Sequence, residues 1–205
     1  MSQYLMQPLP DFFFARATTI ALPAPLLRGK LMLVRANAGS AMRRFINQPQ
    51  RYTRWCWAAV SSAVSKFYNT ASTWSQCLIA AEETHVACCG PEGATTCNID
   101  WSLEDALGRT GNLLKMEERR LNLQELDREI NGLGHVVCIR IEWEGGGGHF
   151  LTLCGVTATG TVHIADPDSR YGTSTLPLSI FPTAYRRPGN WTHTYFTQPR
   201  PDVTA

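Results

Sequence analysis

Residues 50–59 read QRYTRWCWAA and lead directly into a segment with helical periodicity. Apolar side chains recur at the spacing of one helix face between Ala58 and Phe67. Thr53 is the expected N-cap, which places Cys56 in the first turn of the helix. There the helix dipole and the free N–H groups favour a thiolate, the form of cysteine that acts as a nucleophile. A free cysteine buried on a helix face is the structural alternative.

The number of cysteines also sets Cys56 apart. The sequence has 7 cysteines, so six can pair and one remains. Gln50 stands six residues before Cys56 and can supply one side-chain N–H to a developing oxyanion. The backbone N–H of Cys56 is the second expected donor. These residues together indicate nucleophilic acyl transfer on a cysteine.

Two alternating segments predict a β-hairpin. Val136–Trp143 and His149–Cys154 alternate apolar and polar residues, and a glycine loop joins them. An antiparallel hairpin centred on residue 146 pairs residues whose numbers add to 292. One face then carries Val137, Ile139, Ile141, Trp143, His149, Leu151 and Leu153. His149 lies at the rim of this apolar face, next to the glycine loop, where a substrate has room.

The next predicted strand, Thr161–Ala165, supplies a partner for His149. Asp166 shares the parity of the inward residues of this strand, whereas His163 has the opposite parity. His149 is therefore the expected general base, and Asp166 the group that fixes its tautomer and favours its charged form. Asp168, in the following turn, is the fallback for Asp166. Trp191 is expected either to shield the His–Asp pair from water or to pack in the core.

Gln50 together with Trp55–Ala59 resembles the papain-like cysteine proteases, and most closely the Avr-type effectors that bacterial plant pathogens secrete. The resemblance covers about residues 48–195. It implies an α+β fold in which an N-terminal helical lobe, carrying the nucleophile helix, packs against a C-terminal antiparallel β-sheet lobe. It also implies a Cys56–His149–Asp166 triad with Gln50 in the oxyanion hole. Papain itself has asparagine at the third position, and the aspartate here matches the effector branch.

The other six cysteines form two groups. Four lie within 21 residues: Cys77, Cys88, Cys89 and Cys97. Two disulfides fit this group, and a vicinal bond is the least favourable connectivity because it is strained. The alternatives are zinc binding with His85 or four free thiols. Cys138 and Cys154 face each other across the predicted hairpin and either bond or stay as buried thiols. Disulfides would imply an oxidising destination.

The order of the remaining elements predicts the fold class. Trp74–Thr84 reads as a helix, Ser102 begins another, and Asn122–Gly132 is a further helix. Antiparallel strands follow these helices, which is typical of an α+β fold with helices segregated from a sheet.

Charge divides the chain near residue 50. Residues 1–49 hold six Lys/Arg and one acid, a net charge of +5, whereas the whole chain has +2. This basic extension is expected to be a disordered tail with one strand at Leu31–Val34, or else a pro-segment or an export signal. Its charges are scattered without interleaved aromatic residues, which disfavours nucleic-acid binding. No secretory signal-peptide pattern is present, and the longest apolar run, Trp55–Val60, is too short to cross a membrane.

The sequence therefore predicts two units, residues 1–49 and a papain-like cysteine protease domain at 50–205. The expected function is that of a secreted cysteine endopeptidase, a bacterial effector or toxin, that needs no cofactor or metal. Its expected partners are a protein substrate and an inhibitor or immunity protein; a monomer is expected, with no nucleic acid and no membrane insertion. The alternatives are an amidase, deamidase or transglutaminase-like acyltransferase with the same triad, and a non-enzymatic, cystine-stapled binding module.

Overall fold

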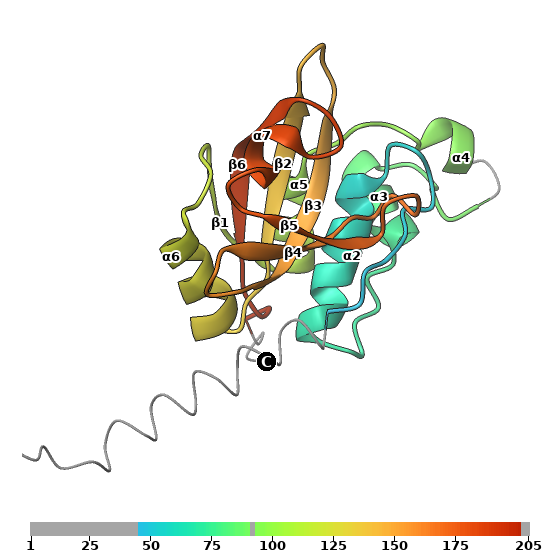
Figure 1. Cartoon of the computed structure of the whole chain (residues 1–205). Helices are drawn as coiled ribbons and strands as arrows, with labels where there is room; N and C mark the ends of the chain where they lie inside the picture. Colours follow the sequence, from blue (N-terminus) through green and yellow to red (C-terminus); the bar gives the residue numbers. More distant parts are fainter. Residues whose placement is uncertain (1–44, 91–92, 202–205) are drawn as a thin grey trace, which may run out of the picture.

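The computed structural model describes residues 45–90 and 93–201 (Figure 1). The expected strand at Leu31–Val34 and most of the basic extension lie outside these residues. The helices are α2 (Cys56–Tyr68), α3 (Gln76–Thr84), α4 (Gly93–Thr96), α5 (Leu103–Thr110), α6 (Leu123–Leu126), the π-helix η1 (Asp127–Gly132) and α7 (Phe181–Ala184). The strands are β1 (Leu113–Glu117), β2 (Val137–Trp143), β3 (Gly148–Val156), β4 (Thr161–Ala165), β5 (Thr173–Pro177) and β6 (Gly189–Thr197).

The six strands form one antiparallel sheet in the order β1-β6-β2-β3-β4-β5. The β2–β3 hairpin pairs Val137 with Leu153 and Ile141 with His149, so the paired numbers add to 290. The predicted sum of 292 is wrong by two residues because Trp143 and Gly147 close the turn, which centres the hairpin on residue 145 instead of 146. A shift of two keeps every side chain on its predicted face, since strand side chains alternate with a period of two.

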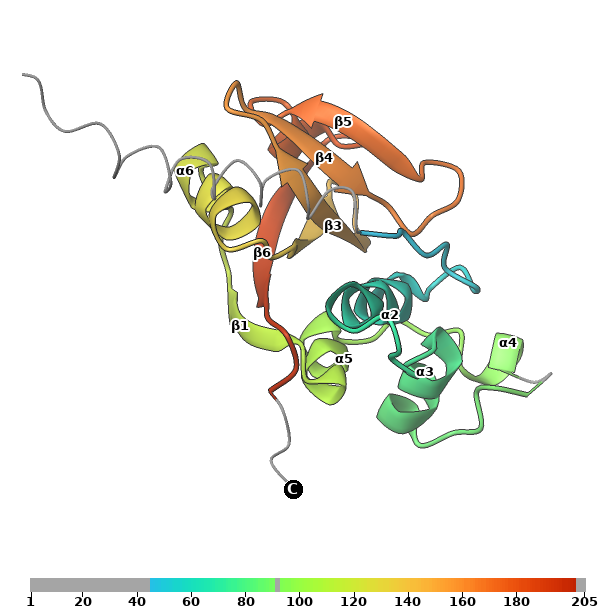
Figure 2. The ribbon, with the colours of Figure 1, turned by 90° about the horizontal axis from the view of Figure 1, so that it is seen from below.

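Helices cover both faces of the sheet. Figure 2 shows α2, α3 and α5 grouped on one side, with α6 apart from them. On the side of α2, strand residues such as Cys138 and Tyr195 pack against the helices. On the other face, Leu126 and Ile130 of the α6–η1 segment pack against the apolar residues of β2, β3 and β4. This arrangement confirms the predicted α+β fold, a helical lobe packed against an antiparallel β-sheet lobe.

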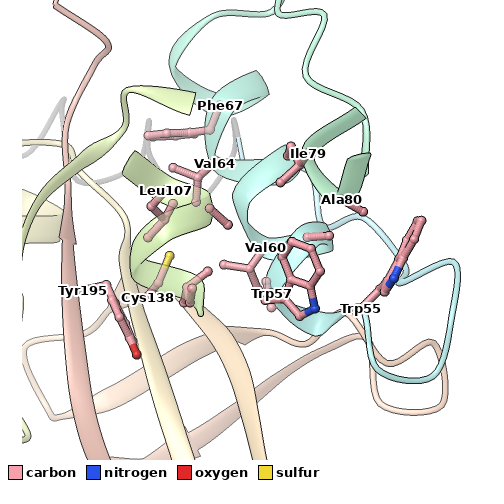
Figure 3. Close-up of a cluster of buried hydrophobic side chains, with 14 of the residues drawn as sticks. Trp55, Trp57, Val60, Val64, Phe67, Ile79, Ala80, Leu107, Cys138 and Tyr195 are labelled. Carbon is pink, nitrogen blue, oxygen red and sulfur yellow. The ribbon is translucent and has the colours of Figure 1, made fainter. Parts of the chain in front are cut away.

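Helix α2 is the centre of the helical lobe. Every residue from Cys56 to Ser65 is buried, and the small side chains among them let the neighbouring elements approach closely. Figure 3 shows Val60 and Val64 of this helix between α5 and α3, close to Cys138 and Tyr195 of the sheet. Burial of this kind stabilises the fold by roughly 25 cal/mol per Å² of apolar surface. Because α3, α5 and the sheet all pack against α2, the helix is fixed in position.

The structure corrects several local predictions. Thr53 does not cap α2: the N-cap is Trp55, and the Thr53 hydroxyl instead accepts a hydrogen bond from Asn98. The predicted helix at Asn122–Gly132 begins with a capping box between Asn122 and Glu125, but it continues as a π-helix from Asp127. Ser102 caps α5 as expected, because its side chain accepts from the Asp105 N–H.

Residues 45–49, at the end of the basic extension, contact the domain. The ring of Phe45 lies 5.9 Å from that of Phe67, and the amide of Asn47 donates to the backbone oxygen of Asp166. The Ser62 hydroxyl donates to Gln48. Among the described residues, no helix is both long and apolar enough to cross a membrane.

Candidate active site

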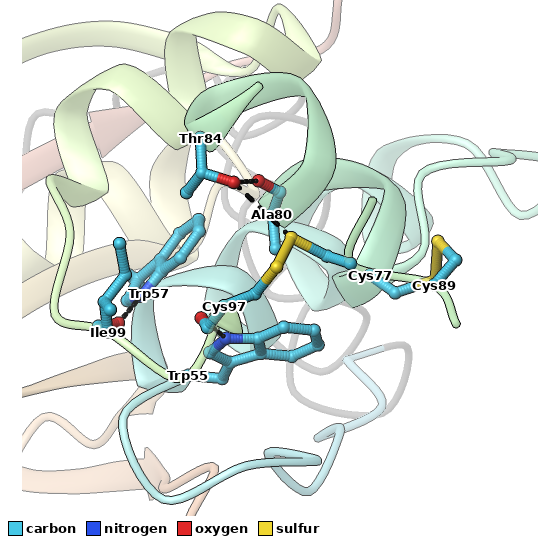
Figure 4. Close-up of a disulfide and its surroundings, with 9 residues drawn as sticks. Trp55, Trp57, Cys77, Ala80, Thr84, Cys89, Cys97 and Ile99 are labelled. Carbon is cyan, nitrogen blue, oxygen red and sulfur yellow. Dashed lines mark hydrogen bonds between the residues drawn. A yellow bond between two sulfur atoms is a disulfide. The ribbon is translucent and has the colours of Figure 1, made fainter. Parts of the chain in front are cut away.

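Cys56 is the first residue of α2, with 8% of its surface exposed. Both flanking tryptophans are held by a neighbouring segment of the chain. The indole of Trp55 donates to the Cys97 carbonyl at 2.6 Å, and that of Trp57 to the Ile99 carbonyl at 3.0 Å (Figure 4). The first N–H groups of a helix have no acceptor within it, so the Cys56 N–H is free for a ligand. The thiol is thus placed at an electropositive helix start by two anchored indoles.

The segment that holds the tryptophans is itself held by disulfides. Cys88 bonds to Cys97, and Cys77 bonds to Cys89 (Figure 4). This pairing avoids a vicinal bond, and it leaves no thiolates among these four cysteines for zinc. Cys138 and Cys154 are free thiols, because the register places Thr152 rather than Cys154 opposite Cys138.

The two free thiols of the sheet are not suited to nucleophilic chemistry. Burial raises the pKa of Cys138 to about 12 and that of Cys154 to about 11. Both groups therefore stay protonated near neutral pH, whereas the Cys56 thiol faces a pocket. A thiol reagent applied to the folded, oxidised protein is expected to reach Cys56 first.

His149 and Asp166 meet as their strand parity predicts. His149 Nε2 lies 2.8 Å from Asp166 Oδ1, and both side chains are buried. Because Nε2 faces the carboxylate, Nδ1 is the ring nitrogen left for the thiol, and the Cys56 side chain is within hydrogen-bonding reach of the imidazole. The fallback residue, Asp168, pairs with Arg170 instead, and this ion pair lowers the pKa of Asp168 to about 2.

The charge state of the imidazole follows from these contacts. Burial by itself would lower the pKa of His149, but the hydrogen bonds and charges of Asp166 and Cys56 outweigh it and raise the pKa to about 9. Burial would likewise raise the pKa of Asp166, but its contacts with His149, Tyr185 and Arg186 hold it below the usual value. An imidazolium next to an ionised aspartate is thus favoured at neutral pH.

Three further residues complete the surroundings of the His–Asp pair, and the sequence pattern predicted a site role for none of them. The Tyr185 hydroxyl donates to Asp166 Oδ2 at 2.6 Å, and the Arg186 guanidinium pairs with the same oxygen. Trp143 stacks on the His149 ring with centroids 5.8 Å apart. Trp191 packs in the core against Phe181, so the stacking residue is Trp143. The strand pattern placed Trp143 on the His149 face but gave it no role, and Tyr185 and Arg186 lie in an irregular segment without periodicity.

Gln50 lies in the same pocket, but its amide is engaged. Its Nε2 donates to the Tyr52 carbonyl at 3.0 Å and to the Thr53 carbonyl at 2.8 Å. Its backbone N–H donates to the Pro167 carbonyl, which ties it to the segment that carries Asp166. In this conformation the amide braces the loop before α2. Donation to an oxyanion requires it to release one of these carbonyls.

The site opens into a pocket of about 450 Å³ between the two lobes. The helical lobe contributes the loop from Gln50 to Arg54, with Cys56 and Asp100, and the sheet lobe contributes Trp143, Gly148 and His149. The hairpin loop at its edge is built from Gly145–Gly147, all of which have positive φ, a conformation that glycine adopts freely.

Stability should fall as the pH rises through about 9. The pKa of His149 is raised above the value of about 6.5 that an unfolded chain gives it, so its stabilising protonation is complete below pH 6.5 and is lost through pH 9. Urea denaturation of the wild type and of His149→Gln at pH 6.5 and 9.5 measures this contribution. The wild type should lose more unfolding free energy between the two pH values than the variant; equal losses would contradict the prediction.

Comparison with known proteins supports the fold. No protein-family model and no curated protein sequence matches this chain. The structure is similar to that of the peptidase domain of Streptococcus ComA, a bi-functional ABC transporter involved in a quorum-sensing pathway, with a TM-score of 0.51 and 19% identity over 76% of this chain and 98% of that chain. The peptidase domain of Streptococcus mutans ComA aligns with a TM-score of 0.43 and 17% identity over 75% and 98%. The similarity to the first of these two structures confirms the predicted papain-like fold.

Proposed function

We propose that this protein is a cysteine endopeptidase with Cys56 as nucleophile, His149 as general base and acid, and Asp166 as the residue that orients the imidazole. The proposal depends on one observation. The Cys56 side chain is within hydrogen-bonding reach of the His149 imidazole, and Nε2 of that ring is hydrogen-bonded to the buried Asp166 carboxylate. A fold similar to that of a solved peptidase domain supports the same chemistry.

The geometry fits each step of acyl transfer. His149 takes the Cys56 proton at Nδ1, and the thiolate attacks the carbonyl carbon of the scissile peptide bond. The oxyanion that forms lies at the start of α2, where the Cys56 N–H points, and Gln50 is the proposed second donor. The imidazolium then gives its proton to the leaving amine, which leaves a thioester on Cys56. Water, deprotonated by His149, hydrolyses that thioester and releases the acid product.

The experiment must separate peptide hydrolysis from other acyl transfers. Wild-type protein is incubated with a mixture of unfolded proteins, and mass spectrometry reads new peptide N-termini, while ammonia release from glutamine side chains is assayed in parallel. New N-termini support the proposal. Ammonia without new termini indicates an amidase or deamidase, and a Cys56 that an alkylating probe does not label faster than an ordinary thiol indicates a binding module.

Gln50→Ala should slow turnover by roughly 10²–10³-fold, the usual effect of losing one oxyanion donor. The alkylation rate of Cys56 should stay near the wild-type rate, because the thiolate does not need the amide. Turnover and iodoacetamide alkylation are measured side by side. If alkylation falls as steeply as turnover, the amide acts by bracing the loop before α2 and not on the transition state.

We also propose that the peptidase is secreted and acts as an effector or toxin on a protein substrate. The two disulfides support an oxidising destination, since such bonds persist mainly outside the reducing cytosol. The effector role is supported by the resemblance of the segment around Cys56 to secreted effector proteases, and it implies an inhibitor or immunity protein as a partner. Recovery of the active protein from culture medium rather than from cells tests the destination.

A further inference from the structure

The short segment between α7 and β6 has an unusual backbone. Arg186 adopts a left-handed conformation with φ of 63°, which few side chains other than those of asparagine, aspartate and histidine adopt. In extended chain, successive side chains point to opposite sides. The left-handed turn at Arg186 instead lets Tyr185 and Arg186 reach the same oxygen, Oδ2 of Asp166.

The Arg186 side chain is nearly buried next to the His149–Asp166 pair. Only 10% of the side chain is exposed, and the guanidinium carbon lies 3.6 Å from the centre of the Tyr171 ring. Besides pairing with Asp166, it lies 3.3 Å from Asp168 Oδ2. Its Nη2 is 3.2 Å from His149 Nε2, a distance at which a permanent cation acts strongly on an imidazolium.

We propose that Arg186 is a positioning residue for the nucleophile–base pair: its guanidinium fixes Oδ2 of Asp166 so that Oδ1 faces the imidazole, and its charge sets the pH range in which Cys56 is reactive. The inference rests on the proposed function, because it assigns a role within the same Cys56–His149 pair. Tyr185 assists as a neutral donor, since burial and the adjacent Asp166 carboxylate raise the pKa of its hydroxyl.

The direction of the effect follows from the charges around the pair. These are Asp166, Asp168, Arg170 and Tyr171 after β4, Tyr185, Arg186 and Arg187 before β6, and Arg51, Tyr52, Arg54 and Asp100 on the helical lobe. Among these cations, Arg186 lies next to His149 and is nearly fully buried. Solvent therefore screens the charge of Arg186 least. A neutral side chain in its place removes a positive charge, which makes thiolate formation less favourable and proton loss from the imidazolium less favourable. Both limbs of the reactivity profile then move to higher pH.

The test measures the rate of Cys56 alkylation by iodoacetamide, a neutral reagent, between pH 4 and 10. Arg186→Met should move the midpoints upward by about one unit, the usual effect of one charge within 4–6 Å. Arg186→Lys keeps the charge and should keep the midpoints, although one ammonium replaces the two guanidinium nitrogens that pair with Asp166 and Asp168. Arg128→Met, at an exposed position on η1, removes the same formal charge outside the site and should leave the profile unchanged.

Asp168→Asn tests the same role of Arg186 if Arg186→Met does not fold. Asp168→Asn frees Arg186 from one of its two carboxylate partners, so the midpoints should move to lower pH. Unchanged midpoints in the folded Arg186→Met, or an upward or absent shift in Asp168→Asn, would overturn the role of Arg186. A wild-type Cys56 that reacts only like an ordinary thiol, with a midpoint near 8.5, would overturn the proposed function itself.

Discussion

Cys56→Ala should abolish peptide hydrolysis, with a loss on the order of 10⁴-fold or more, and His149→Ala should lose a similar amount. A nucleophile and its base act as one unit, so removing either costs nearly as much as removing both. The double variant should therefore be no slower than Cys56→Ala. The measurement is the initial rate of cleavage of an unfolded protein, together with circular dichroism and thermal melting to show that each variant keeps its fold.

His163→Ala is the matched control. His163 lies on β4, one strand away from His149, with the opposite parity, and its ring is close to Gly155 instead of the pocket. This variant should keep wild-type activity. Wild-type-like turnover by Cys56→Ala, or a loss in His163→Ala without a loss in His149→Ala, would show that the assignment of nucleophile or base is wrong.

The sequence predicted those parts of the site that depend on local periodicity. Cys56 lies in the first turn of a helix because the apolar spacing after it is helical. His149 and Asp166 meet because each continues the inward parity of a strand, and parity is unaffected by a two-residue error in register. The incorrect N-cap at Thr53 changed nothing at Cys56, since the helix begins where its side chains become buried.

Contacts between distant segments could not be predicted in this way. Strand β6 pairs with both β1 and β2, although β1 and β2 precede it by many residues, and this non-local pairing leaves no mark in a short window. Tyr185 and Arg186 reach Asp166 only through an irregular turn. Cys97 and Ile99 bind the two tryptophans through backbone carbonyls, which every residue carries. No residue type signals such a contact.

The two disulfides differ in surroundings although they close loops of similar length. Their cysteines are 12 and 9 residues apart, so loop-closure entropy predicts about 3 kcal/mol of stability from each. Cys88 and Cys97 are fully buried in the helical core, whereas Cys89 is exposed. The Cys88–Cys97 bond also anchors the segment whose carbonyls bind Trp55 and Trp57. Entropy is therefore matched between the pairs, and the remaining difference reports on packing around α2.

Cys88→Ala with Cys97→Ala should lower the free energy of unfolding by about 3 kcal/mol for the lost cross-link and by a further 1–3 kcal/mol for the cavity and the loosened indoles. Cys77→Ala with Cys89→Ala should lose about 3 kcal/mol only. Urea denaturation of both double variants measures the two losses, and iodoacetamide alkylation of Cys56 reads the site. Because the Trp55 and Trp57 contacts place the start of α2, the first variant should also slow alkylation, and the second should leave it unchanged. Equal losses of stability with equal alkylation rates would show that the Cys88–Cys97 bond is a cross-link alone and does not position the nucleophile.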